Sequence, residues 1–172
     1  DKDAFGDNSI YLVSQTLQSK ITMAQAASLK MFVNGEKVEL EPKTINNKNS
    51  IFQEIKIECE KMQPFRLEKL VSVFTSRDFA ISDPLNEAML KINRLESFSF
   101  IYQKQKIAWA HIWEFGNVDL DAKGNEPLIL RLHIFHIYQT VSQNSIGRDI
   151  GVPSRGWHGE AYRGHIFWDE LY

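Results

Sequence analysis

The most restrictive feature of this sequence is a change in the spacing of its apolar residues near residue 80. Before that point, short runs alternate between apolar and charged side chains, which is the two-residue period of strands with one solvated face. After it, apolar residues recur at the three- and four-residue spacing of amphipathic helices. The chain is therefore predicted to begin as an antiparallel β-layer and to continue as helices, an α+β arrangement.

Turn chemistry and alternation together predict the strands. Asn34-Gly35 separates two apolar runs, and its tolerance of positive φ suits a type I′ hairpin turn. The β-layer is expected to extend from about residue 10 to residue 74. Within it, strands are predicted through residues 37–41 and 54–60, through 70–74, and along an early segment that includes Ile21 and Met23.

Three helices are predicted after the β-layer. Asp83 before Pro84 provides a capping carboxylate and a proline suited to the first helical turn. A second helix is expected over residues 98–114, and Asn125-Glu126-Pro127 opens a third over residues 128–141. The predicted apolar stripe of the first helix comprises Leu85, Ala88, Met89, Ile92 and Leu95; the predicted buried set of the second comprises Ile101, Tyr102, Trp109, Ile112 and Trp113.

Charge and hydropathy argue against two classes of partner. Lys plus Arg number 20 and Asp plus Glu number 22, so a net charge of −2 attracts neither nucleic acid nor an anionic membrane. The longest apolar stretches are interrupted by Arg131, His133 and His136, so no transmembrane helix is expected. We therefore expect a globular protein without a nucleic-acid or membrane partner.

Cysteine and histidine usage predicts neither a disulfide nor a metal site. Cys59 is the only cysteine, so an intrachain disulfide is impossible and a cytoplasmic location is expected. His133 and His136 lie one helical turn apart, but no carboxylate or cysteine stands at ligand spacing. They are interpreted as packed helix residues, and no metal is predicted.

The last part of the chain, residues 147–172, has neither a strand nor a helix period. Glycines recur through it and permit sharp turns and close approach of the backbone to a ligand. Aromatic rings, carboxylates and guanidinium groups alternate between them, a composition that suits a neutral polyol such as a sugar. The alternative is an ordinary ordered loop. The segment lacks the spacing of a phosphate-binding Walker loop and the strand-turn-helix context of a dinucleotide fingerprint.

Residues 151–170 read Gly-Val-Pro-Ser-Arg-Gly-Trp-His-Gly-Glu-Ala-Tyr-Arg-Gly-His-Ile-Phe-Trp-Asp-Glu, which resembles the signature of glycoside hydrolase family 65. That family includes maltose, kojibiose and trehalose phosphorylases and some hydrolases such as acid trehalases. Two upstream segments, residues 108–113 and 130–136, resemble its first barrel helices. Residues 14–27 more weakly resemble a strand of its amino-terminal β-sandwich.

The resemblance implies a division of the chain into three parts. Residues 1–80 would be part of an amino-terminal β-sandwich, residues 81–97 a helical linker, and residues 98–172 the start of an incomplete (α/α)6 catalytic barrel. The chain is expected to be an amino-terminal fragment, inactive alone, whose partner is the remainder of the barrel. Incomplete cover over residues 98–142 should leave apolar helix faces exposed and favour homo-oligomers.

The resemblance also implies site residues and a reaction. Trp168 and Asp169 would contact glucose in subsite −1, and the positioning residues would be Arg155, Tyr162, Arg163 and His165. The implied reaction is inverting phosphorolysis of an α-glucosyl disaccharide, with inorganic phosphate as co-substrate, no cofactor, and glucose 1-phosphate as product. The general acid, a glutamate, is expected downstream of residue 172, so no catalytic residue is assigned here. The alternatives are a trehalase-like hydrolase and a non-catalytic carbohydrate-binding module.

Overall fold

The computed structural model of this chain describes residues 1–6, 8–58, 60–142 and 151–152. They form two compact units, Asp1–Lys104 and Gln105–Tyr172, which are described separately. In chain order the elements are β1 (Lys2–Phe5), β2 (Ser9–Gln15), β3 (Thr22–Val33), β4 (Glu36–Val38), β5 (Lys43–Asn47), β6 (Ser50–Glu54), β7 (Phe65–Thr75), α1 (Pro84–Arg94), α2 (Phe98–Gly116) and α3 (Glu126–Tyr138).

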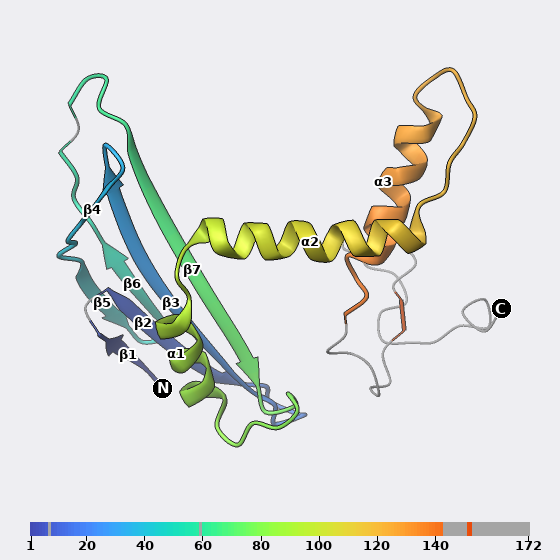
Figure 1. Ribbon diagram of the computed structural model, residues 1–172. Helices are drawn as coiled ribbons and strands as arrows, with labels where there is room; N and C mark the ends of the chain where they lie inside the picture. The colour runs from blue at the N-terminus through green and yellow to red at the C-terminus, as the bar shows by residue number, and fades with distance from the viewer. Residues whose placement is uncertain (7, 59, 143–150, 153–172) are drawn as a thin grey trace. The chain divides into compact units, whose positions relative to one another are not determined.

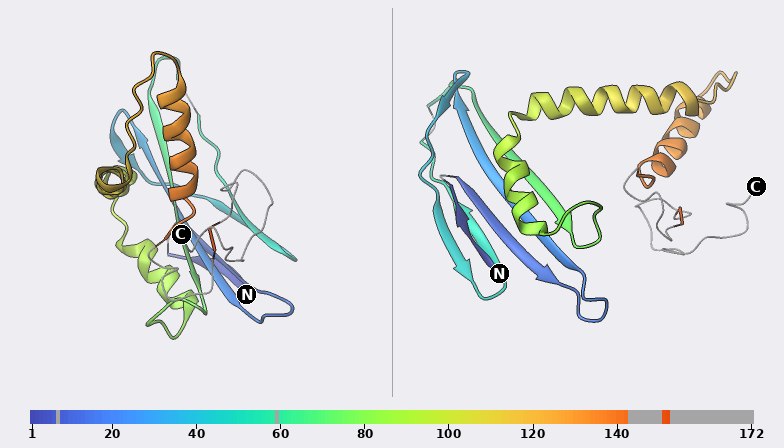
Figure 2. Two further views of the ribbon diagram at one scale, coloured as in Figure 1. Left: turned by 90° about the vertical axis from the view of Figure 1, so that its right-hand side faces the viewer. Right: turned by 60° about the horizontal axis from the view of Figure 1, so that its bottom comes forward.

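The first unit is built on an antiparallel sheet of five strands (Figure 1). The long strand β3 is its centre: β2 and β4 pair with successive parts of one edge of β3, and β7 pairs with the whole of the other edge. β1 continues the sheet beyond β2. A separate ribbon of β5 and β6 lies on one face of the sheet and α1 lies on the other (Figure 2). The predicted α+β class with a sandwich-like β start is confirmed.

The hairpin between β3 and β4 turns at the predicted dipeptide. Asn34 has φ +53° and Gly35 has φ +88°, the two positive values that a type I′ turn requires. β4 ends at Val38, however, and the predicted continuation of this strand to residue 41 is wrong. Leu40 is nevertheless buried, so its apolar side chain is covered although its backbone lies outside a strand.

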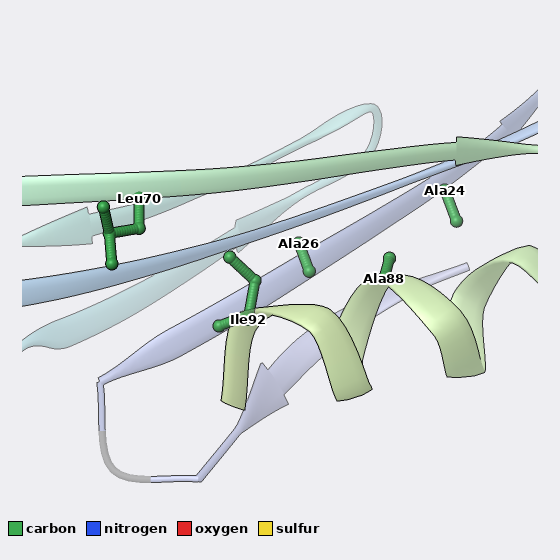
Figure 3. Close-up of a cluster of buried hydrophobic side chains, with 5 residues drawn as sticks. All are labelled: Ala24, Ala26, Leu70, Ala88 and Ile92. Atoms are coloured by element: carbon green, nitrogen blue, oxygen red, sulfur yellow. The ribbon is translucent and has the colours of Figure 1, made fainter. Parts of the chain in front are cut away.

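The core of the first unit lies between the sheet and α1 (Figure 3). Ala24, Ala26 and Leu70 face this helix from β3 and β7, and Ala88 and Ile92 face the sheet. The side chains from the sheet are mostly alanine, which lets the helix approach β3 closely. The predicted stripe of α1 is therefore confirmed, with Ala88 and Ile92 as its most buried members.

The start of α1 follows the predicted cap. The Asp83 carboxylate accepts a hydrogen bond from the backbone N–H of Leu85 at 3.0 Å, and Pro84 is the first helical residue. At the other end, the Lys30 ammonium group donates to the backbone carbonyls of Leu95 and Glu96. Both ends of α1 are therefore held, one of them by the strand on which the helix packs.

Two other expectations need correction. Residues 55–58 belong to no strand, because β6 ends at Glu54; Cys59 lies outside the described residues. In α2 none of the predicted buried set is fully buried, and Tyr102 is 51% exposed. The predicted helix is confirmed, but the spacing of its apolar residues shows only that they share one face of α2, not that this face is covered.

The third helix begins at the predicted Glu126-Pro127 and ends at Tyr138, before the expected residue 141. Leu128, Ile129, Leu132 and Ile137 are exposed around it, as expected for a helix that is apolar on nearly every side. Among the described residues, no helix combines the length and hydropathy needed to cross a bilayer.

Candidate functional site

The predicted sugar-binding residues lie outside the part of the chain that the structure describes. They are Arg155, Tyr162, Arg163, His165, Trp168 and Asp169. Within the predicted signature, Gly151 and Val152 are described, and Gly151 is buried. The structure therefore neither brings the six residues together nor separates them, and their assignment stays a prediction. What it does describe in the second unit is the helical framework that precedes the signature.

That framework is an aromatic contact between α2 and α3. The ring centroids of Trp109 and Phe135 lie 4.8 Å apart. One helical turn further along α2, Trp113 meets Tyr138 edge-on at 6.4 Å. The tryptophans of α2 also lie 6.3 Å from each other. Tilted and edge-on aromatic pairs stabilise a packed interface beyond the apolar area they bury, so Phe135 and Tyr138 hold the last turn of α3 against α2.

A glycine at the end of α2 leaves room for a tyrosine side chain of α3. The ring and hydroxyl of Tyr138 lie against Gly116, the last residue of α2, so closely that a Cβ there would come within 2.5 Å of the ring carbons. Real Cβ atoms do not approach other atoms this closely. Gly116 is therefore needed as glycine for packing, and Tyr138 is held at the point where the chain leaves α3.

Polar contacts fix the same region. The Asp119 carboxylate accepts hydrogen bonds from the Asn117 amide at 2.8 Å and from the Arg131 guanidinium at 3.3 Å, which ties the connection after α2 to α3. The His136 ring bonds the Gln139 amide at 3.0 Å, just after the end of α3.

His136 is half-buried, but His133 is exposed, so the expectation of two packed histidines is wrong for His133. The described residues contain no cluster of His, Cys, Asp or Glu suited to a metal ion.

Sequence reasoning missed a groove in the first unit. A hollow of about 430 Å³ lies between the sheet face opposite α1 and a second wall formed by β6 and the residues that follow it. Its lining is mostly apolar and includes two polar residues, Gln53 and Lys69. The lining includes Ile10, Ala27, Leu29 and Leu67 from the sheet, with Ile51, Phe52, Ile55 and Ile57 opposite them. The alternation of Ile55 and Ile57 was the available signal, but it was interpreted as strand pairing.

Taken together, the described residues define an α+β protein in which a strand-rich unit is followed by a helical one. Comparison with known families agrees with this order. A profile of the glycosyl hydrolase family 65 N-terminal domain matches residues 1–112, and a profile of the family 65 central catalytic domain matches residues 131–172. The chain therefore belongs to glycosyl hydrolase family 65.

Similar proteins are much longer than this chain. An uncharacterized glycosyl hydrolase of Mycobacterium tuberculosis is 35% identical over 96% of this chain, which spans 12% of that protein. A trehalose 6-phosphate phosphorylase of Lactococcus lactis is 30% identical over 94% of the chain and 20% of its own length. A kojibiose phosphorylase of Halothermothrix orenii is 23% identical over 98% of the chain and 23% of its own length.

Proposed function

We propose that these residues belong to a longer enzyme that phosphorolyses an α-glucosyl disaccharide with inversion. The observation that supports this most strongly is the match of residues 131–172 to the family's catalytic domain. Relatives named for phosphorolysis of kojibiose and of trehalose 6-phosphate support the reaction class. Since the chain spans 12% to 23% of these relatives, most of the catalytic machinery is proposed to lie outside it.

In this proposal the signature forms one wall of the glucose site. Trp168 covers one face of the sugar ring and Asp169 accepts hydrogen bonds from its hydroxyls. Arg155, Tyr162, Arg163 and His165 position these groups. The contacts of α2 with Phe135 and Tyr138 support the proposal by fixing the end of α3, which precedes the signature in the sequence.

In the proposed reaction, the acid and the nucleophile act on opposite faces of the sugar. A glutamic acid from the remainder of the barrel protonates the glycosidic oxygen, while inorganic phosphate attacks the anomeric carbon from the other side. The products are glucose 1-phosphate of inverted configuration and the released sugar. No metal or organic cofactor takes part, and a cytoplasmic location belongs to the same proposal.

Hydrolysis is the second candidate, because the mycobacterial relative is named a glycosyl hydrolase. A hydrolase would use a second carboxylate to activate water. The two reactions are separated by incubating the longer protein with kojibiose, maltose, trehalose or trehalose 6-phosphate, with and without inorganic phosphate. Phosphate-dependent glucose 1-phosphate supports the proposal, and free glucose formed at the same rate without phosphate contradicts it.

Sugar binding by the isolated 172-residue chain separates the two enzymatic candidates, a phosphorylase and a hydrolase, from a non-catalytic binding module. A site divided between this chain and the rest of a barrel should bind glucose weakly when this chain is alone, because the hydrogen-bonding groups of the remaining barrel are missing. Isothermal titration with glucose, maltose and trehalose measures this. Sub-millimolar binding by the isolated chain would favour a non-catalytic carbohydrate-binding module instead.

A further inference from the structure

The core face of the sheet carries two charged residues at neighbouring positions. Side chains alternate between the two faces of a strand, so Lys30 lies on the same face of β3 as the buried Ala24 and Ala26. By the same alternation, Glu68 lies on the same face of β7 as the buried Leu70. The register of β3 and β7 places Lys30 directly opposite Glu68. An ammonium group and a carboxylate therefore stand next to each other on the face of the sheet that α1 covers.

Both charged groups reach the short connection between α1 and α2. The Lys30 ammonium group donates hydrogen bonds to two backbone carbonyls of this connection, that of Leu95 at 3.0 Å and that of Glu96. The Glu68 carboxylate accepts a hydrogen bond from the backbone N–H of Phe98, the first residue of α2, at 3.3 Å. Two opposite residues of the sheet therefore hold the chain on both sides of one connection.

The signs of the two charges match the helix ends that they contact. The last carbonyls of a helix lack intrahelical partners and carry partial negative charge, and the first N–H groups of a helix carry partial positive charge. Lys30 supplies a cation at the end of α1, and Glu68 supplies an anion at the start of α2. Hydrogen bonds of this kind, with one ionised partner, are stronger than those between neutral groups. An exchange of the two charges would oppose both helix ends.

We propose that Lys30 and Glu68 act together as a clamp that fixes the direction in which α2 leaves the sheet. A contact on one side of the connection would leave the other side free to move, whereas contacts on both sides hold the connection as one unit. The base of the clamp is rigid, because β3 and β7 pair along the whole of β7. The clamp lies within the first unit, which includes the first turns of α2 up to Lys104. It gives this unit a role that the proposed reaction does not assign.

The clamp predicts that loss of Lys30 weakens a hydrogen bond that Lys30 does not make. The first N–H of a helix has no intrahelical partner, so exchange of the Phe98 amide hydrogen with solvent reports on its bond to Glu68. K30M keeps a long apolar side chain and removes the ammonium donors. We expect NMR to show exchange at Phe98 at least about tenfold faster in K30M than in the wild type, because release of the α1 side also releases the α2 side.

A second lysine provides the matched control. Lys91 also lies in the last turn of α1, and its side chain is exposed. K91M therefore removes the same charge near the same helix end but leaves both contacts of Lys30 in place. Exchange at Phe98 should be the same in K91M as in the wild type. K30R retains a cation with several N–H donors and should restore most of the protection that K30M loses.

Distance measurements test the direction of α2. On a Cys59→Ser background, spin labels at K37C on β4 and at Q103C on α2 report where the first turns of α2 lie relative to the sheet. K30M should broaden the distribution of distances between the two labels, measured by pulsed electron paramagnetic resonance. K91M should leave the width of this distribution unchanged. Far-UV circular dichroism of each variant checks that the sheet is intact.

Charge exchange separates the clamp from an ordinary cross-strand ion pair. Because Lys30 and Glu68 lie opposite each other, a pair that served only the sheet would tolerate K30E/E68K. The clamp would not, since each new charge meets a helix end of its own sign, so exchange at Phe98 should be as fast as in K30M. Wild-type exchange at Phe98 in K30M or in K30E/E68K, or equal effects of K30M and K91M, would each overturn the proposal. If the charge-exchanged variant unfolds, the comparison of K30M with K91M decides.

Discussion

The buried Glu68 carboxylate accepts a hydrogen bond from the backbone N–H of Phe98 at 3.3 Å, which joins the middle of β7 to the first residue of α2. Its other oxygen lies 3.4 Å from the Arg66 guanidinium, which in turn lies over the Phe32 ring at 4.3 Å. The first N–H groups of a helix lack intrahelical partners and favour negative charge. Ser97 caps the Phe100 N–H at 3.2 Å in the usual way, and the strand carboxylate satisfies the Phe98 N–H in addition.

Removal of this carboxylate should destabilise the first unit. Glu68→Ala leaves a partly buried N–H unpaired and should lower the free energy of unfolding by about 2 kcal/mol. Glu68→Gln keeps an acceptor and should lose less. Arg66→Ala removes only the exposed partner of the pair, so we expect a loss below about 1 kcal/mol. Urea unfolding followed by far-UV circular dichroism measures all three; an equal loss for Arg66→Ala and Glu68→Ala would contradict the anchoring role.

The two faces of β3 should respond differently to the same added volume. Ala26 is fully buried against α1, and Ala27 is only half-buried on the opposite face. Valine is favoured in strands, but its two added methyl groups have no room at position 26. Ala26→Val should therefore lower the free energy of unfolding by about 1–3 kcal/mol. Ala27→Val should be neutral or stabilising, because it adds apolar surface to the groove wall. Thermal unfolding measures both variants. An equal fall of the two unfolding midpoints would contradict the difference in packing between the two faces of β3.

The contact between Gly116 and Tyr138 provides a prediction for the second unit. Gly116→Ala should lower the stability of this unit by about 1–2 kcal/mol, although alanine favours helices, because its Cβ overlaps the tyrosine ring. Gly124→Ala is the matched control, since the nearest atoms there belong to the flexible Glu126 carboxylate.

Tryptophan fluorescence isolates this effect. All four tryptophans follow residue 104 in the sequence, so their emission reports on the second unit while strand circular dichroism reports on the first. We expect the urea midpoint of fluorescence to fall for Gly116→Ala and to stay within experimental error for Gly124→Ala. A fall of the same size in both variants would show that glycine flexibility, rather than the tyrosine contact, is what matters.

Sequence reasoning succeeded where local chemistry determines the backbone. Asp83-Pro84 starts α1 and Asn34-Gly35 turns the hairpin because a capping bond and positive φ depend on the residues themselves. It failed where alternation was taken as evidence of pairing. Ile55 and Ile57 do line the groove, but in the part of the chain that the structure describes they belong to no strand.

Burial was the second point at which sequence reasoning failed. The spacing of Trp109 and Trp113 correctly placed both on one face of α2, and that face does contact α3. Whether a face is covered depends on elements distant in sequence, which periodicity does not identify. The same holds for Gly116, since nothing near it in the sequence indicates that Tyr138 packs on it.

The proposed sugar contact predicts a kinetic effect in the longer protein. Asp169→Ala would remove the carboxylate that is proposed to accept hydrogen bonds from glucose hydroxyls. Hydrogen bonds to a charged group contribute about 1.5–3 kcal/mol, so kcat/KM should fall roughly 10- to 100-fold. Glu170→Ala is the matched control, because it removes a neighbouring carboxylate that is not proposed to bind the sugar. Initial rates with the preferred disaccharide measure both, and unchanged kinetics for Asp169→Ala would remove that residue from the site.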